Sequence, residues 1–250
     1  METFFCQKEV IVAAGVFNTP KILELSGIGT KELLEKHNIT TVLDLPGVGE
    51  NLQDHLMTGL SYEVVDGVLT GDPLMRQEPD AIILAQKLYV ENKAGPFTIG
   101  GMQFHAFMPT PDISALLDSV QAEESLDTER SALIRSIVDD PQGSSGAWLM
   151  FLAQTNLHEG SKSFVGSQLL PGNYISLECI QAHPFSRGSS HISSADIVAV
   201  PEINPGYLSH PTDQEILARH LQSLETVLRS SEHLSKFLKP EGKRNHPDAF

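Results

Sequence analysis

The chain has 250 residues, of which 40% are hydrophobic, and its formal net charge is -15 at pH 7. This length and apolar content suffice for one large folded domain or two smaller ones. The acidic charge argues against nucleic acid and anionic membranes as partners, because both carry negative charge themselves. The sequence also contains no run of about 18 apolar residues, the length that is needed to span a bilayer.

The first predicted element is a strand over residues 9–14, an apolar, β-branched run typical of a strand buried on both faces of a parallel sheet. Gly15 then turns the chain. Thr19-Pro20 predicts the start of a helix, because the hydroxyl can cap exposed N–H groups and a proline at the first helical position loses no needed donor. The chain therefore opens with a strand-turn-helix unit, which glycines 27 and 29 end.

From about Ser61 the sequence changes character and predicts entry into a second, mainly antiparallel domain. The remaining predicted elements are a helix from Thr30, a strand over 40–45, a glycine turn over 46–49, a helix over 79–92, surface helices within 110–142, strands over 147–155, 173–182 and 191–193, and an amphipathic helix over 212–230. We therefore predict a first domain over residues 1–57 and a second over residues 58–250.

The residues that could carry chemistry form no self-sufficient catalytic motif. Cys6 and Cys179 are too few for a disulfide framework or a thiolate zinc site. The 10 histidines lack the paired spacing of metal ligands, so no metal site is expected. Neither a Gly-x-Ser-x-Gly elbow nor a phosphate loop is present. One apolar cluster could line a pocket but is more typical of a core: Phe97, Met102, Phe104, Phe107 and Met108.

The run from Gly15 to Gly29 resembles the second signature of the glucose-methanol-choline (GMC) oxidoreductases, which use FAD to oxidise alcohols. The matching positions are Gly15, Thr19, Pro20, Ile22, Leu23, Ser26, Gly27, Ile28 and Gly29. Val16 departs from the pattern, since the family prefers a small residue there. Further stretches resemble the family in the same order: 45–55, 95–96, 183–188 and 193–213. The resemblance thus extends over nearly the whole chain.

The resemblance implies an α/β plus α+β fold. Residues 1–57 would be part of a Rossmann-like FAD-binding domain, and residues 58–250 a substrate domain with a mainly antiparallel sheet, covering helices and the start of the family's C-terminal region. It also implies FAD as cofactor, a small alcohol as substrate and hydride transfer to the flavin.

Two parts of the family's chemistry are not found in these residues. One is the Gly-x-Gly-x-x-Gly turn whose helix holds the FAD pyrophosphate. The other is the catalytic histidine in a His-Pro-x-Gly-Thr type motif, because His246-Pro247 is followed by Asp248. We therefore expect this chain to be an internal portion of the enzyme, inactive alone and without a catalytic residue of its own.

Carried across by position, Ala13, Ala14 and Gly15 would lie against the cofactor, where small side chains permit close approach of the backbone. The other interpretation is that the glycine serves only the geometry of a tight turn. Both can hold together.

Asn51, Asp54 and His55 belong to a stretch that, in the family, lies near the domain junction and the flavin. They could form hydrogen bonds there or serve only as structural junction residues. His55 is not assigned as the catalytic base, because that role requires reach to the alcohol proton, which spacing alone does not establish.

The alternative class of function is a non-catalytic binding or structural module that kept the substrate-side scaffold. Such a module would need protected strand edges, because unpaired strands invite aggregation. The sequence indicates no particular alcohol, no choice between oxidase and dehydrogenase, no cellular location and no oligomeric state.

Overall fold

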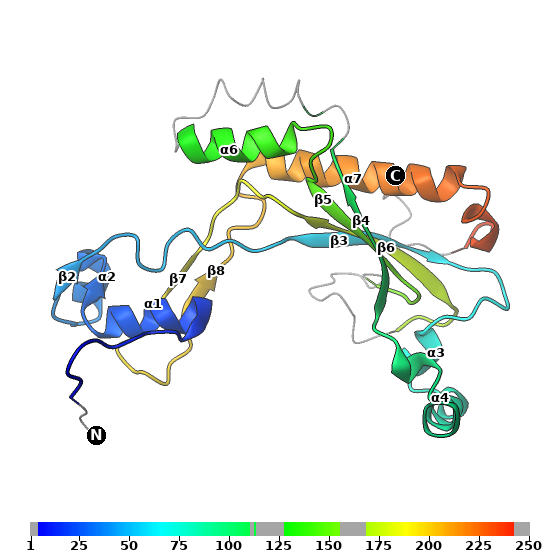
Figure 1. The fold of residues 1–250 in the computed structure, drawn as a ribbon, viewed down its shortest axis with the longest axis horizontal. Coiled ribbons are helices and arrows are strands. Elements are labelled where there is room, and N and C mark those ends of the chain that lie inside the picture. Colours follow the sequence, from blue (N-terminus) through cyan, green and yellow to red (C-terminus); the bar gives the residue numbers. More distant parts are fainter. Residues whose placement is uncertain (1–4, 111–112, 114–127, 156–168, 243–250) are drawn as a thin grey trace. The chain divides into compact units, whose positions relative to one another are not determined.

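The computed structural model describes residues 5–110, 113, 128–155 and 169–242. The chain divides into two compact units, one built from residues 1–54 and 186–210 and the other from residues 55–185 and 211–250. Figure 1 labels most of the elements of both units. Residues 186–210, which the sequence analysis places in the second domain, group with the N-terminal residues, while the functional division at residue 57 stays a prediction.

The first unit is small and built from short elements. These are α1 (Gly15–Leu25), β1 (Ile28–Gly29), α2 (Lys31–Lys36), β2 (Leu43–Asp44), β7 (Ser189–His191) and β8 (Glu202–Asn204). Strands β1 and β2 pair in parallel, and β7 and β8 pair antiparallel. Helix α1 packs against β7, so the last part of this unit covers the first.

Two expectations for the start of this unit were wrong. Residues 9–14 form no strand, and Val10 and Ile11 are 75% and 81% exposed, because no neighbouring strand among the described residues pairs with them. Helix α1 begins at Gly15 rather than at Thr19, so Pro20 lies inside it. The Thr19 hydroxyl instead accepts a hydrogen bond from the backbone N–H of Ala14 at 3.1 Å and so closes the turn before the helix.

The second unit contains a 4-stranded sheet in the order β3-β6-β5-β4. Its elements are β3 (Met57–Glu63), α3 (Asp72–Met75), α4 (Pro79–Asn92), η1 (Pro96–Thr98), β4 (Met102–Met108), α6 (Thr128–Val138), β5 (Gly146–Phe151), β6 (Tyr174–Gln181), α7 (Pro211–Ser230) and η2 (Ser235–Phe237). All neighbouring strands pair antiparallel, which confirms the predicted antiparallel sheet. None of the described helices is long and apolar enough to cross a membrane.

Helix α7 covers one face of this sheet, as Figure 1 shows in orange. Leu217, Leu224 and Leu228 of α7 are buried against Leu60 of β3 and Leu177 of β6. Their spacing along α7 puts one apolar stripe on the sheet, as the amphipathic pattern predicts. Burial of this stripe stabilises the second unit, because it removes apolar surface from water.

The predicted aromatic core was wrong for most of its members. Phe97 and Phe104 are each 49% exposed, and Phe107 is 71% exposed. Strand β4 lies at the edge of the sheet, so its side chains have neighbours on only one side. Met108 alone of these packs against the buried cluster under α7.

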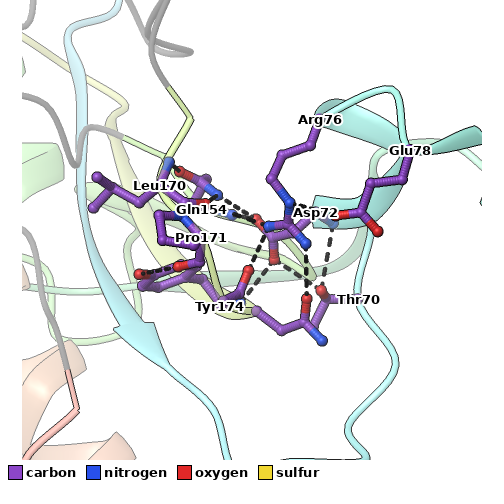
Figure 2. A network of polar contacts seen from close by, with 10 residues as sticks. Thr70, Asp72, Arg76, Glu78, Gln154, Leu170, Pro171 and Tyr174 are labelled. Carbon is purple, nitrogen blue, oxygen red and sulfur yellow. Dashed lines mark hydrogen bonds and ion pairs between the residues drawn. The ribbon is translucent and has the colours of Figure 1, made fainter.

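A buried carboxylate ties α3 to the sheet, as Figure 2 shows. Asp72 Oδ1 accepts hydrogen bonds from the backbone N–H and the Nε2 of Gln154, both at 2.9 Å. Its Oδ2 accepts from the backbone N–H of Tyr174 at 2.7 Å and from the Thr70 hydroxyl at 2.8 Å. Because both oxygens have donors, the charge is compensated although the residue is fully buried.

Candidate functional site

The turn at Ala13, Ala14 and Gly15 leads from an extended segment into α1. Gly15 has a φ of +83°, and a Cβ built on it would meet no atom within 4 Å. The backbone conformation therefore requires glycine here, and the space beside it is open among the described residues. No side chain caps the N-terminus of α1, so its positive end could face an anionic or polar group.

The segment around Asn51 is held by residues 187 and 188 of the same unit. Asn51 has a φ of 60°, a left-handed conformation that is uncommon for a residue other than glycine. Its side-chain oxygen accepts a hydrogen bond from Arg187 Nε at 3.1 Å. Leu52 and Gly188 exchange two backbone hydrogen bonds of 2.8 Å. These contacts fix a strained backbone, a feature that is often found at ligand sites.

Asp54 and His55 are neighbours in sequence but belong to different units. Within the first unit, the Tyr207 hydroxyl donates a hydrogen bond to Asp54 Oδ2, and this bond is the main cause of the raised pKa of Tyr207. Within the second unit, His55 Nδ1 lies 2.6 Å from the carbonyl oxygen of Gln181. A carbonyl only accepts, so Nδ1 carries a hydrogen and donates it to this oxygen. The described contacts of Asp54 therefore lie in the first unit, and those of His55 lie in the second.

A histidine that the sequence analysis did not select lies between two carboxylates of the first unit. His191 Nδ1 is 2.7 Å from Glu24 Oε1, and His191 Nε2 is 3.0 Å from Glu50 Oε1. Glu24 is fully buried, and its other oxygen accepts from the backbone N–H of Ile192 at 2.8 Å. Burial lowers the pKa of His191, but hydrogen bonds and negative charge from Glu24 and Glu50 outweigh it, so the pKa is raised. The two carboxylates thus favour the protonated form of His191, whose ring joins α1, the turn at 46–50 and β7.

Sequence reasoning did not select the partners that hold these segments. Arg187 and Tyr207 lie in the stretches that resemble the family, so the resemblance offered a signal for them. Glu24 offered a weaker signal, since it is a charged residue between Leu23 and Leu25. A charge at such a position predicts a buried partner but does not identify it.

Comparisons with known proteins agree with one another. A family model described as GMC oxidoreductase matches residues 1–57. A dehydrogenase from Armillaria gallica is 36% identical over 231 residues, which cover 85% of this chain and 34% of the relative. Patulin synthase from Aspergillus clavatus is 34% identical over 217 residues, which cover 86% of this chain and 32% of the relative.

Solved structures show the same fold. A formate oxidase from Aspergillus oryzae, studied for its FAD modification, matches with a TM-score of 0.70 and 26% identity over 94% of this chain and 39% of its own. An FAD-dependent oxidoreductase from Chaetomium thermophilum matches in fold with a TM-score of 0.73 and 22% identity over 94% of this chain and 40% of its own. The chain thus spans 32% to 40% of the length of these four proteins.

Proposed function

Because the chain belongs to the GMC oxidoreductase family, whose members are FAD-dependent, we propose that it is part of an alcohol-oxidising flavoenzyme. In that enzyme it would border the flavin and build much of the substrate domain. The match to GMC proteins over most of the chain, at up to 36% identity, carries this proposal. In the complete enzyme a small alcohol is the substrate, and bound FAD supplies the acceptor of the hydride.

The turn at Ala13, Ala14 and Gly15 is proposed to contact FAD. Three observations support a fit: the side chains are small, Ala13 and Gly15 are exposed, and the space at the Gly15 Cβ position is open. The uncapped start of α1 offers N–H groups to a polar or anionic part of the cofactor. Glycine would then serve both the turn geometry and the close approach.

Asn51, Asp54 and His55 are proposed to position polar groups near the flavin rather than to act as the base. Arg187 and Tyr207 hold the first two side chains, and the Gln181 carbonyl accepts a hydrogen bond from His55 Nδ1. These hydrogen bonds orient the three side chains, and no proton transfer is assigned to them.

We propose further that this chain alone neither holds FAD tightly nor oxidises alcohols. The motivation is the lack, in this sequence, of the pyrophosphate-binding glycine turn and of the catalytic histidine motif. The purified chain should be colourless and inactive with alcohols and an artificial electron acceptor. A yellow protein that oxidises alcohols would contradict this part of the proposal.

The cofactor contact has a matched test. Gly15 and Gly67 both have positive φ, 83° and 89°, and both have nothing within 4 Å of a built Cβ. We expect weak FAD binding, followed by quenching of flavin fluorescence, to be reduced in Gly15→Asp and unchanged in Gly67→Asp. Equal binding by both variants and the unchanged chain would refute the contact at Gly15.

The alternative of a stand-alone, non-catalytic module is less well supported. Such a module would need a protected edge, yet β4 is an edge strand in the described sheet and its Phe107 is 71% exposed. An exposed aromatic edge is better explained by a surface that other parts of a larger enzyme cover.

A further inference from the structure

A hollow of about 440 Å³ lies in the first unit, beside α1, the turn at 46–50 and β7. Its volume falls within the range of roughly 300–1,000 Å³ that is usual for small-molecule sites. The residues that give it its chemistry are the apolar Val16, Pro20 and Leu52 and the polar Glu50, Asn51 and Ser190. The hollow therefore combines an apolar wall with a small set of polar groups, as ligand sites do.

Ser190 provides the first sign that a ligand is expected there. The residue is only 2% exposed, yet its hydroxyl oxygen has no hydrogen-bond partner in the part of the chain that the structure describes. Its backbone N–H donates to the Gly49 carbonyl at 2.7 Å, which fixes the strand that carries the side chain. Buried hydroxyl groups in folded proteins nearly always have partners, so this one calls for a group that the described residues do not supply.

Glu50 provides the second polar group, and its orientation is fixed. His191 holds one of its carboxylate oxygens at 3.0 Å, and the buried Glu24 holds His191 from the other side at 2.7 Å. Two carboxylates against one imidazolium leave the cluster with a net negative charge. The hollow therefore disfavours phosphates and other anions and favours neutral groups that donate hydrogen bonds.

We propose that this hollow binds a neutral vicinal diol, of the kind carried by ribitol and ribose, through the Glu50 carboxylate and the Ser190 hydroxyl. A carboxylate accepts from sugar hydroxyl groups in the same way that an acidic residue holds a ribose in dinucleotide sites. Val16, Pro20 and Leu52 contact the carbon side of the diol. The inference deepens the proposed function and rests on it only in naming the flavin's ribityl chain or the ribose of FAD as one source of the diol. A free sugar alcohol is the other source.

The test uses the full chain and four probes: ribitol, adenosine, riboflavin and FAD. Saturation-transfer NMR measures binding, and amide shifts of residues 47–53 and 190 locate it. We expect ribitol or adenosine to bind, and Ser190→Ala and Glu50→Gln each to weaken that binding roughly threefold to tenfold. Glu202→Gln, an exposed carboxylate on β8 outside the hollow, is the control and should bind like the unchanged chain.

The outcomes separate this inference from the proposed function. Binding of ribitol that depends on Ser190, with no response to riboflavin or FAD, supports the diol site and identifies a free sugar alcohol as its ligand. FAD binding that Gly15→Asp weakens and Ser190→Ala leaves unchanged overturns the diol site and leaves the flavin contact standing. No binding of any probe, or equal binding by Ser190→Ala and the unchanged chain, also overturns it.

Discussion

The first unit surrounds His191 with carboxylates, whereas the second surrounds His220 with an indole and hydroxyl groups. His220 Nδ1 accepts a hydrogen bond from Trp148 Nε1 at 3.0 Å, and its Nε2 lies 3.0 Å from the Ser145 hydroxyl. Burial without a nearby carboxylate lowers the pKa of His220 to about 4. His191 is only partly buried, with 20% of its side chain exposed, and Glu24 and Glu50 raise its pKa. Burial and the acceptors around a ring thus together set the direction in which its pKa moves.

The largest expected effect comes from removing the buried acceptor of His191. Glu24→Gln takes away the charge that faces His191 Nδ1, so the first unit should lose about 3 kcal/mol of unfolding free energy. Glu50→Gln is the matched control: its side chain is 53% exposed, so we expect a loss below about 1 kcal/mol. Hydrogen exchange of the α1 and β7 amides measures both. Equal losses would contradict the assignment of Glu24 as the dominant partner.

His220 predicts a loss of stability of the second unit in acid. Its pKa in the folded chain, about 4, lies below the ordinary 6.5, so the unfolded chain binds the proton first as the pH falls. The contribution of the neutral His220 ring to the unfolding free energy is fully present above pH 6.5. It is lost as the pH falls towards 4, by about 3 kcal/mol in all. Urea unfolding followed by Trp148 fluorescence measures it, since this is the one tryptophan of the chain. The stability difference between the unchanged chain and His220→Gln should shrink by that amount, and a difference independent of pH would contradict the neutral, buried ring.

Glu178 should give the opposite slope in the same unit, with an effect of similar size. Burial raises its pKa to about 7; the Thr155 hydroxyl donates to one of its oxygens, and the other, buried beside Gly59, has no partner among the described residues. The pKa of Glu178 in the folded chain exceeds its ordinary value of 4.5. The contribution of protonated Glu178 to the unfolding free energy is therefore fully present below pH 4.5 and is lost as the pH rises to about 7.

Glu178→Gln removes this charge. The unfolding free energy of the variant, measured relative to the unchanged chain, should rise by about 3 kcal/mol between pH 4.5 and pH 8, because only the unchanged chain carries this titrating group. Glu91→Gln, an exposed carboxylate on α4, should show no such trend. If the difference in unfolding free energy between Glu178→Gln and the unchanged chain does not rise with pH, Glu178 is not the group that titrates.

Local features of the fold were predictable from sequence, and long-range ones were not. Helix α4 runs from Pro79 to Asn92 as predicted, because proline at its start and Lys93 in a left-handed conformation at its end are local signals. The run at 9–14 has strand composition but no strand, because pairing depends on a neighbour that composition does not supply. The return of residues 186–210 to the first unit is likewise a tertiary property.

The same division applies to the candidate site. Gly15 was predictable, since a strand-like segment followed by a helix needs a residue that tolerates positive φ. The pairing of Glu24 with His191 joins residues 167 positions apart, and no periodicity in one sequence links them. Proposed contacts of Ala13, Ala14 and Gly15 with flavin therefore stay predictions from the family, while the histidine environments follow from the fold.

The smallest expected effect is on the titration of His191 itself, and it tests the comparison of the two histidines most directly. In the unchanged chain the ring Cε1–H shift should report a pKa above 6.5, whereas His220 should stay neutral until well below it. Glu50→Gln should lower the pKa of His191, and Glu24→Gln should lower it further, because Glu24 is buried and its charge is less screened. The stabilisation that His191 provides is then full below pH 6.5 and is lost as the pH rises through its folded pKa. If His191 titrates below 6.5 in the unchanged chain, the two carboxylates do not outweigh burial, and Glu50 is then held by a neutral ring rather than by an imidazolium.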